Sequence, residues 1–201
     1  LDPKAFRDIR RGELAPVLAG IRRALEVGLK PVKLNMVVFQ HTLPYIPGMI
    51  DFIGHGDGLK LQLIQFMPEL VGDRDWDVDI DGGKKGLEQR ADKGLVREMH
   101  HRRIYIFNGA EVEVVDPVRN AEFCFNCHRI RVTHDGKLKG CLNRNDDLIP
   151  TRGLDDDGLR DAFRRVVANR VPFYGVHVKD YPRRNPSAAL PIDLSALVSA
   201  K

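Results

Sequence analysis

The sequence lacks the features that place a chain in or across a membrane. It contains no run of about 20 apolar residues, the length that a membrane-spanning helix needs. Its first residues show no charged start followed by an apolar stretch, the pattern of a secretory signal. Internal repeats and low-complexity tracts are also missing. We therefore expect a cytoplasmic protein with no membrane partner.

Cysteine is scarce, with three copies at Cys124, Cys127 and Cys141. Three cysteines cannot all pair as disulfides within one chain, and nothing in the sequence indicates an oxidising compartment. Three thiolates can hold a zinc ion or an iron–sulfur cluster and leave one coordination position open. The segment from Cys124 to Cys141 is therefore the first candidate for a site.

The overall composition is that of a globular domain, with 43% hydrophobic and 30% charged residues among 201. The net charge of +4 suits a phosphate-bearing ligand but does not demonstrate nucleic acid, which we do not expect as a partner. The chain begins at Leu1 and not at Met. We expect it to be part of a longer protein.

The first third of the sequence predicts alternating helices and strands. Helices are expected over 3–11 and from Pro16 in a first turn to Gly28, with a weaker helical pattern over 45–54. Apolar and β-branched runs predict strands over 31–39 and 59–68. This order is typical of an α/β fold with a parallel sheet or barrel. Lys33 would be a strand-end lysine in solvent, or a ligand contact if its strand lines a barrel.

The next segments predict a polar loop over 72–93 and a short helix over 94–102. Asn108-Gly109 between two alternating runs predicts a β-hairpin over 103–115. A second hairpin is expected over 129–142 with its turn at 134–136, which would carry Cys127 toward Cys141. A helix is predicted over 155–169, with Leu159, Phe163, Val166 and Val167 on its apolar side, before a proline-rich tail.

Two arginines follow the first cysteine pair. On a strand, Arg129 and Arg131 would point to the same face, where two guanidinium groups could bind a polyphosphate. A candidate metal centre would then lie beside a candidate anion site.

The spacing of the cysteines leaves several metal centres open. Cys124-Phe-Asn-Cys127-His128 matches the attachment motif of c-type haem, but that reading gives no role to Cys141 or to the arginines. A structural zinc site of three cysteines with His128 or His134 is a second alternative. An iron–sulfur cluster is the third alternative. The simplest alternative is a CxxC pair that occurs by chance and binds no metal. Spacing alone does not separate zinc from iron–sulfur.

Longer stretches of sequence carry a resemblance to a known family. The segment 123–142 resembles the C-terminal cluster motif of the GTP 3′,8-cyclase family, radical S-adenosylmethionine (SAM) enzymes of molybdenum cofactor biosynthesis. Residues 28–38 and 64–68 resemble two barrel strands of the same family. The resemblance covers about residues 1 to 170.

The resemblance implies a function and a set of site residues. Members are lyases that convert GTP to (8S)-3′,8-cyclo-7,8-dihydroguanosine 5′-triphosphate with SAM. They use two 4Fe–4S clusters, and the C-terminal cluster has three cysteine ligands. The matching positions imply Cys124, Cys127 and Cys141 as metal ligands. They also imply Arg129, Arg131 and Lys33 as GTP contacts and Met67 as a SAM contact.

Departures from the family pattern define what this chain cannot do alone. It has no CxxxCxxC motif, so the resemblance implies that the radical-generating cluster and SAM chemistry belong to a missing N-terminal half, and that this chain is inactive by itself. Gln62 stands where many members carry an arginine directed toward the GTP phosphates. The chain also lacks the Gly-Gly terminus of the family.

The resemblance also implies a domain arrangement. Residues 1–71 would be the last βα units of an incomplete TIM-type (β/α) barrel, and 72–93 a polar loop. Residues 94–201 would be a small α+β domain with β-hairpins that holds the iron–sulfur cluster and GTP. A homodimer and a non-catalytic Cys3His zinc module both stay open.

Overall fold

The computed structural model describes residues 1–54, 58–67, 76–118, 120–173 and 190–191. The chain divides into two compact units. Unit 1 contains residues 1–97 and 102–116 together with 190–191, and unit 2 contains 98–101 and 117–173, within the described ranges.

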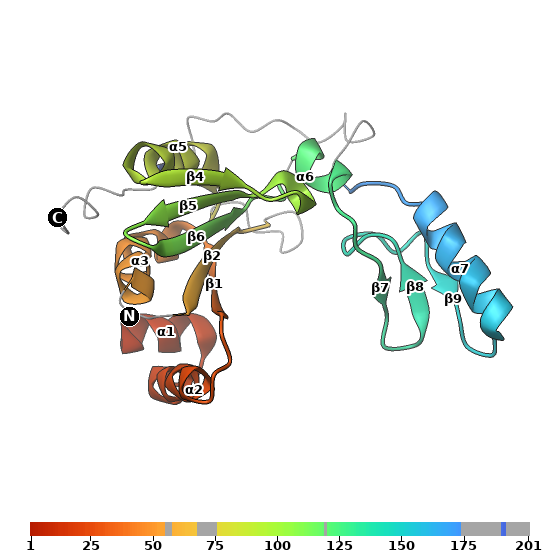
Figure 1. Cartoon of the computed structure of the whole chain (residues 1–201), viewed down its shortest axis with the longest axis horizontal. Coiled ribbons are helices and arrows are strands. Elements are labelled where there is room, and N and C mark those ends of the chain that lie inside the picture. The colour runs from red at the N-terminus through yellow and green to blue at the C-terminus, as the bar shows by residue number, and fades with distance from the viewer. Residues whose placement is uncertain (55–57, 68–75, 119, 174–189, 192–201) are drawn as a thin grey trace. The chain divides into compact units, whose positions relative to one another are not determined.

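Unit 1 combines helices with a mixed sheet (Figure 1). Its helices are α1 (Pro3–Arg10), α2 (Leu14–Glu26), the 3-10 helix η1 (Gln40–Tyr45), α3 (Ile46–Gly54) and α5 (Ile80–Arg90). Its strands are β1 (Val32–Val38), β2 (Leu59–Gln65), β3 (Val78–Asp79), β4 (Lys93–Val96), β5 (Arg103–Phe107), β6 (Ala110–Val115) and β10 (Leu190–Pro191).

The main sheet has five strands in the order β1-β2-β6-β5-β4. Strands β1, β2 and β6 run parallel, whereas β5 and β4 extend the sheet in antiparallel pairs. Strands β3 and β10 form a separate parallel pair. The predicted α/β class with a parallel sheet is therefore confirmed.

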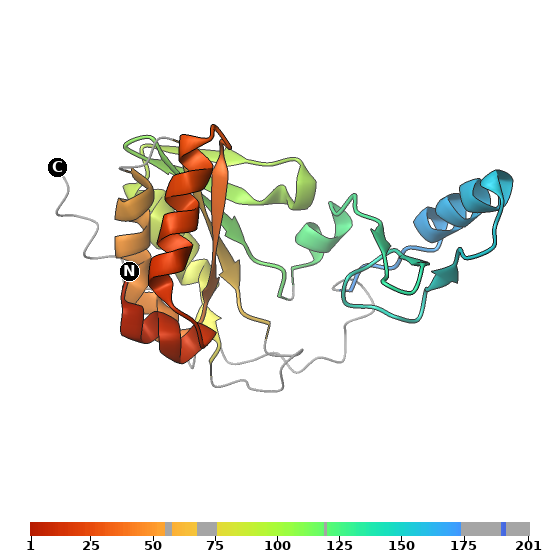
Figure 2. The ribbon, with the colours of Figure 1, turned by 90° about the horizontal axis from the view of Figure 1, so that it is seen from below.

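The two faces of this sheet differ in chemistry because successive side chains of a strand point to opposite sides. One face is apolar and buried, and the helices of unit 1 lie on it (Figures 1 and 2). Its central residues are Leu61, Leu63, Tyr105, Val112 and Val114. The opposite face carries the alternate residues of the same strands, which include charged and polar residues of β1, β2 and β6 as well as apolar ones such as Ile104 and Ile106 of β5.

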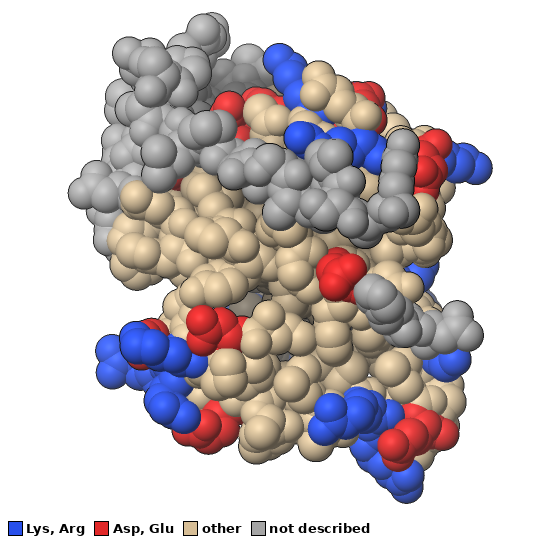
Figure 3. Space-filling view, turned by 90° about the vertical axis from the view of Figure 1, so that its left-hand side faces the viewer, with Lys and Arg blue, Asp and Glu red and all other residues tan. Residues whose placement is uncertain are grey.

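A cavity of about 450 Å³ lies among the helices of unit 1. Its lining is mostly apolar, with Leu1, Ile21, Leu25 and Phe52 among its residues. Figure 3 shows one surface of the molecule on which most charged side chains lie toward the margins, while an acidic one lies near the middle among uncharged residues. This cavity contains none of the residues that the sequence predicted to bind a ligand.

The first two predicted helices are confirmed. The Asp2 carboxylate caps α1 by accepting hydrogen bonds from the backbone N–H groups of Lys4 and Ala5 at 2.8 and 3.1 Å. Helix α2 has Pro16 within its first turn, and the chain leaves it through Gly28 at φ +80°. The predicted strands over 31–39 and 59–68 correspond to β1 and β2.

The polar loop predicted over 72–93 is wrong for residues 80–90, which form α5. The Asp79 carboxylate accepts a hydrogen bond from the Gly82 N–H at 2.9 Å and caps this helix. Ile80 and Leu87 are buried against the sheet, so tertiary packing overrides three glycines that disfavour a helix. Residues 72–75 of the predicted loop lie outside the described residues.

The short helix predicted over 94–102 is also wrong in its first half, where Lys93–Val96 forms the edge strand β4. The hairpin predicted over 103–115 is confirmed as β5 and β6. Asn108 and Gly109 have φ values of +47° and +87° at its turn, the left-handed conformation that a tight hairpin needs.

Unit 2 is smaller and mixes short helices with a three-stranded antiparallel sheet of order β7-β8-β9. Its elements are η2 (Met99–His101), α6 (Ala121–Phe125), β7 (Arg131–Val132), β8 (Lys137–Lys139), β9 (Ile149–Pro150) and α7 (Asp156–Ala168). Leu138 and Ile149 of the sheet pack with Ala162 and Val166 of α7 to form its core.

The predicted second hairpin is confirmed in a shorter form, as β7 and β8. The predicted helix over 155–169 is confirmed as α7, capped by Asp155, which accepts from the Gly158 N–H at 2.9 Å. Its predicted apolar side is only partly right, because Phe163 and Val167 are 45% and 59% exposed while Val166 is buried.

Among the described residues, no helix combines the length and the apolarity needed to cross a membrane. Most of the proline-rich tail predicted beyond residue 172 lies outside the described residues.

Candidate functional site

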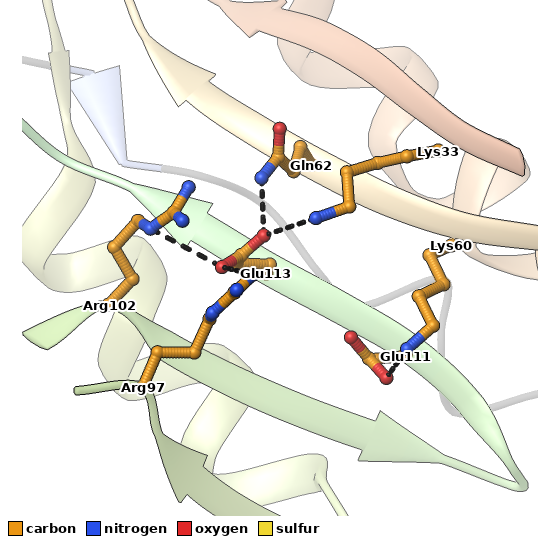
Figure 4. Close-up of polar contacts among 7 residues, drawn as sticks. All are labelled: Lys33, Lys60, Gln62, Arg97, Arg102, Glu111 and Glu113. Atoms are coloured by element: carbon orange, nitrogen blue, oxygen red, sulfur yellow. Dashed lines mark hydrogen bonds and ion pairs between the residues drawn. The ribbon is translucent and has the colours of Figure 1, made fainter. Parts of the chain in front are cut away.

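A single carboxylate organises the polar face of the main sheet. Glu113 of β6 is 1% exposed, and four side chains converge on it (Figure 4). Its Oε2 accepts hydrogen bonds from Lys33 Nζ at 3.1 Å and from the Gln62 amide. Its Oε1 lies 3.2 Å from Arg97 Nη1 and 3.3 Å from Arg102 Nε. Three cations thus surround one anion.

The sheet register explains why these groups meet. Gln62 of β2 lies directly opposite Glu113 of β6 in the parallel pair, and Lys33 of β1 lies opposite Lys60, two residues before Gln62. These residues alternate with the buried apolar ones, so they share the opposite face. Arg97 and Arg102 flank the turn between β4 and β5, where the Arg97 N–H donates to the Arg102 carbonyl at 2.9 Å.

The environment of Glu113 favours its charged form. Burial alone raises the pKa of a carboxyl group, but hydrogen bonds from Gln62 and Lys33 and the charge of Arg102 outweigh it. The pKa of Glu113 therefore lies below the ordinary value of 4.5. The carboxylate is ionised at neutral pH.

A simpler ion pair lies two residues away on the same strand. Lys60 of β2 donates to Glu111 of β6 at 2.5 Å, one cation to one anion. Figure 4 shows this pair beside the Glu113 cluster. The pair is electrically balanced, whereas the cluster around Glu113 carries two more positive charges than negative ones.

The sequence predicts Lys33 either as a lysine with its amine in solvent or as a ligand contact. In the structure its side chain is neither fully exposed nor fully buried. Its amine pairs with Glu113, and its side chain keeps 34% of its surface exposed. Gln62 is buried and donates to Glu113. Met67 follows β2 and is partly buried.

The three cysteines all lie in unit 2, all are of intermediate exposure, and none forms a disulfide within the part of the chain that the structure describes. Cys124 is in α6, Cys127 follows it, and Cys141 follows β8. The Cys127 N–H donates to the Cys124 carbonyl at 3.3 Å, which closes the CxxC turn. The donor chemistry fits an iron–sulfur cluster or zinc.

The residues that the structure describes do not form a closed metal centre. Among the residues that the structure describes, no group of three or more His, Cys, Asp or Glu side chains is arranged to hold a metal ion. Convergence of the three sulfurs on one metal therefore stays a prediction.

Arg170, which the sequence gave no reason to select, ties the cysteine-bearing segments together. Its Nη2 donates to the Cys124 carbonyl at 2.7 Å. A Cβ placed on Gly140, next to Cys141, would lie 3.4 Å from Arg170 Cγ and 2.9 Å from Asp147 Oδ2. The residues on either side of the candidate metal site are thus packed around one arginine.

Several buried polar atoms in unit 2 have no hydrogen-bond partner among the described residues. They are Arg131 Nη1, Arg170 Nε and both carboxylate oxygens of Asp147. Buried polar groups are normally paired, so such groups suit a site that receives a ligand.

The prediction that Arg129 and Arg131 share a strand face is wrong, since β7 begins at Arg131 and Arg129 precedes it.

The hairpin between Cys127 and Cys141 has its own stabilised turn. The Lys137 ammonium, 2.7 Å from Asp135, and a hydrogen bond from the Thr133 hydroxyl lower the pKa of Asp135 to about 2. Thr133 also accepts from the Lys137 N–H at 2.9 Å. These contacts fix how β7 leads into β8.

Sequence reasoning missed Glu113, Arg97, Arg102 and Arg170. A signal existed for Glu113, because Glu111 and Glu113 alternate with valines in a strand whose other residues are apolar. No local signal marks the arginines, since arginine is common on exposed surfaces and only the folded chain brings these three to their partners.

The fold and the site together define an α/β protein with a cationic sheet face and a cysteine-bearing second unit. Residues 59–175 match the family model described as Molybdenum Cofactor Synthesis C. A probable GTP 3′,8-cyclase of Halobacterium salinarum is 46% identical, over 89% of this chain and 57% of its own length. Those of Methanocella arvoryzae and Methanosarcina mazei are each 42% identical, covering 82% and 87% of this chain and 53% and 54% of their own.

The chain therefore belongs to the GTP 3′,8-cyclase family and matches its C-terminal portion. It spans somewhat more than half the length of these curated relatives. No solved structure is similar to it at a significant level. The match gives no support to the alternative of a separate structural zinc module.

Proposed function

We propose that this chain is the GTP-binding, cluster-bearing C-terminal part of a GTP 3′,8-cyclase that acts in the cytoplasm in molybdenum cofactor biosynthesis. The observation that carries the proposal is the 46% identity to a probable GTP 3′,8-cyclase over 89% of the chain. In this proposal the sheet of unit 1 is the end of an incomplete (β/α) barrel, and unit 2 is the iron–sulfur domain.

The residues of unit 2 would bind the base end of GTP. Cys124, Cys127 and Cys141 would hold a 4Fe–4S cluster, which supplies an iron with an open position for the guanine. Arg129 and Arg131 would contact GTP. The unpartnered buried Nη1 of Arg131 supports this role, because a ligand would satisfy it.

Residues of unit 1 would contact GTP and line the site of SAM. Lys33 would contact GTP, and its partly exposed side chain on the cationic sheet face supports this assignment. Met67 would line the site of SAM. A rigid anchor at the guanine base would hold C8 of GTP near the ribose, which is a proximity effect.

Catalysis would need the N-terminal half, which carries the cluster that acts on SAM. We expect this chain alone, supplied with SAM, reductant and GTP, to form no cyclised product. Addition of the missing half should restore product. Product from this chain alone would contradict the proposal.

The direct test is anaerobic purification followed by iron, sulfide and zinc analysis. We expect about four irons and four sulfides per chain, and a spectral change when GTP is added. Cys141→Ala should lose the iron. His128→Ala and His134→Ala are matched controls that should keep it, because a histidine is a ligand only in the zinc alternative. One zinc per chain, lost in either histidine variant, would overturn the proposal.

A further inference from the structure

The cluster around Glu113 has an inner and an outer layer. The inner partners, Gln62 and Arg102, are 9% and 5% exposed. The outer donors, Lys33 and Arg97, keep 34% and 42% of their side-chain surface exposed. Glu113 Oε2 accepts hydrogen bonds from Gln62 and Lys33, whereas Oε1 accepts one from Arg97 and forms an ion pair with Arg102. Figure 4 shows the four side chains reaching Glu113 from different strands and from the β4–β5 turn.

The charges of this cluster do not balance. Arg102 and Glu113 form a buried pair of opposite charges. Lys33 and Arg97 then add two positive charges at the solvent side, and Glu113 is the one carboxylate paired with either in the part of the chain that the structure describes. One carboxylate balances only one of the three positive charges, so this face attracts a further anion.

The chemistry of the two outer cations fits a phosphate chain. An arginine presents a planar fork of N–H donors and a lysine a point charge, and both bind phosphate oxygens through charge-assisted hydrogen bonds. Partial burial on the sheet face strengthens such contacts relative to free solution. The neighbouring Lys60–Glu111 pair is balanced and offers no such excess.

We propose that Arg97 is a further phosphate-binding residue for the nucleoside triphosphate and that Glu113 positions both Arg97 and Lys33 for it. This inference rests on the proposed function, which already gives Lys33 a GTP contact, and adds Arg97 and Glu113 to it. Glu113 touches the two cations and not the substrate, so it is a positioning residue.

The test measures binding of inorganic triphosphate, GTP and guanosine to the full 201-residue chain by calorimetry. Arg97→Gln should weaken binding of triphosphate and GTP about tenfold, the loss expected for one charge-assisted contact, and leave guanosine unchanged. Arg103→Gln is the matched control, since Arg103 is also half exposed and pairs with Glu88 instead. Lys60→Met is the control for Lys33→Met, because both lysines are 34% exposed and pair with a glutamate of β6.

The direction in which Glu113→Gln changes the affinity for triphosphate distinguishes two roles of the carboxylate. If Glu113 only reduced the local positive charge, its neutralisation would tighten triphosphate binding. If it orients Lys33 and Arg97, the same substitution weakens binding, and this is the result we expect. Tighter binding would overturn the positioning role. Should Glu113→Gln not fold, Arg97→Gln still tests the inference, because Arg97 is half exposed.

The outcomes separate this inference from the proposed function. Triphosphate binding that is equal in wild type, Arg97→Gln and Arg103→Gln overturns the inference, as does absence of triphosphate binding to the wild-type chain. GTP-dependent spectral change of an iron-loaded chain would still stand in either case. Loss of iron binding with intact, Arg97-dependent triphosphate binding would overturn the cluster proposal and leave the phosphate site.

Discussion

Arg102 and Glu113 form an ion pair inside unit 1, with Arg102 Nε 3.3 Å from Glu113 Oε1 and both residues at most 5% exposed. The pair fixes the end of β6 to the start of β5 at the centre of the polar sheet face. A buried carboxylate with several donors is stable only while its partners remain, because burial of an unpaired charge is costly.

Loss of the charge at Glu113 should destabilise unit 1. Glu113→Gln removes the negative charge that pairs with the buried Arg102, and we expect the free energy of unfolding to fall by about 3 kcal/mol. Urea denaturation followed by circular dichroism measures it. Glu111→Gln is the control and should cost less than about 1 kcal/mol, because its pair with Lys60 is partly exposed. Equal losses in the two variants would contradict the special role of Glu113.

The stability of unit 1 should depend on pH through Glu113. Its pKa is lower in the folded than in the unfolded chain, so the ionised carboxylate stabilises the fold above the ordinary value of 4.5. This contribution is lost as the pH falls below 4.5 through the folded pKa. The difference in unfolding free energy between wild type and Glu113→Gln should therefore shrink as the pH is lowered. A difference that stays constant down to about pH 3 would refute it.

Gly140 should tolerate no side chain. A Cβ there would lie 2.9 Å from Asp147 Oδ2, 3.3 Å from the Val166 carbonyl and 3.4 Å from Arg170 Cγ. We expect Gly140→Ala to destabilise unit 2 by about 1–3 kcal/mol, the usual cost of overpacking. The control is Gly20→Ala on the exposed side of α2, where a Cβ meets nothing within 4 Å. It should be neutral or stabilise by about 0.5–1 kcal/mol. Thermal unfolding of the two variants compares them directly.

Arg170 should help to hold the segment of Cys124. Arg170→Gln removes the 2.7 Å hydrogen bond to the Cys124 carbonyl. We expect a lower iron content after anaerobic reconstitution and faster release of iron to a chelator, with far-ultraviolet circular dichroism unchanged. Arg165→Gln, which alters an exposed arginine of α7 paired with Asp161, should behave as wild type. Normal iron retention in Arg170→Gln would show that the contact has no part in metal binding.

Local sequence patterns determined much of the fold. Helices α1, α2 and α7, strands β1 and β2 and the hairpin at Asn108-Gly109 follow from caps, periodicity and turn residues that act within a few positions. The sequence also located the cysteine–arginine segment, because spacing and residue type are local properties. Burial of Ile80 and Leu87, which turns a polar and glycine-rich stretch into α5, depends on a sheet built from distant strands.

The tertiary structure alone decided the partners of the charged residues. Glu113 meets Lys33 across 80 positions of sequence and Gln62 across 51, and these contacts exist because parallel pairing of β1, β2 and β6 fixes the register. Arg170 reaches Cys124 across 46 positions. The sequence specified which chemical groups the chain carries, whereas the pairing of its strands determined which of them share one face, since long-range contacts depend on register and not on local propensity.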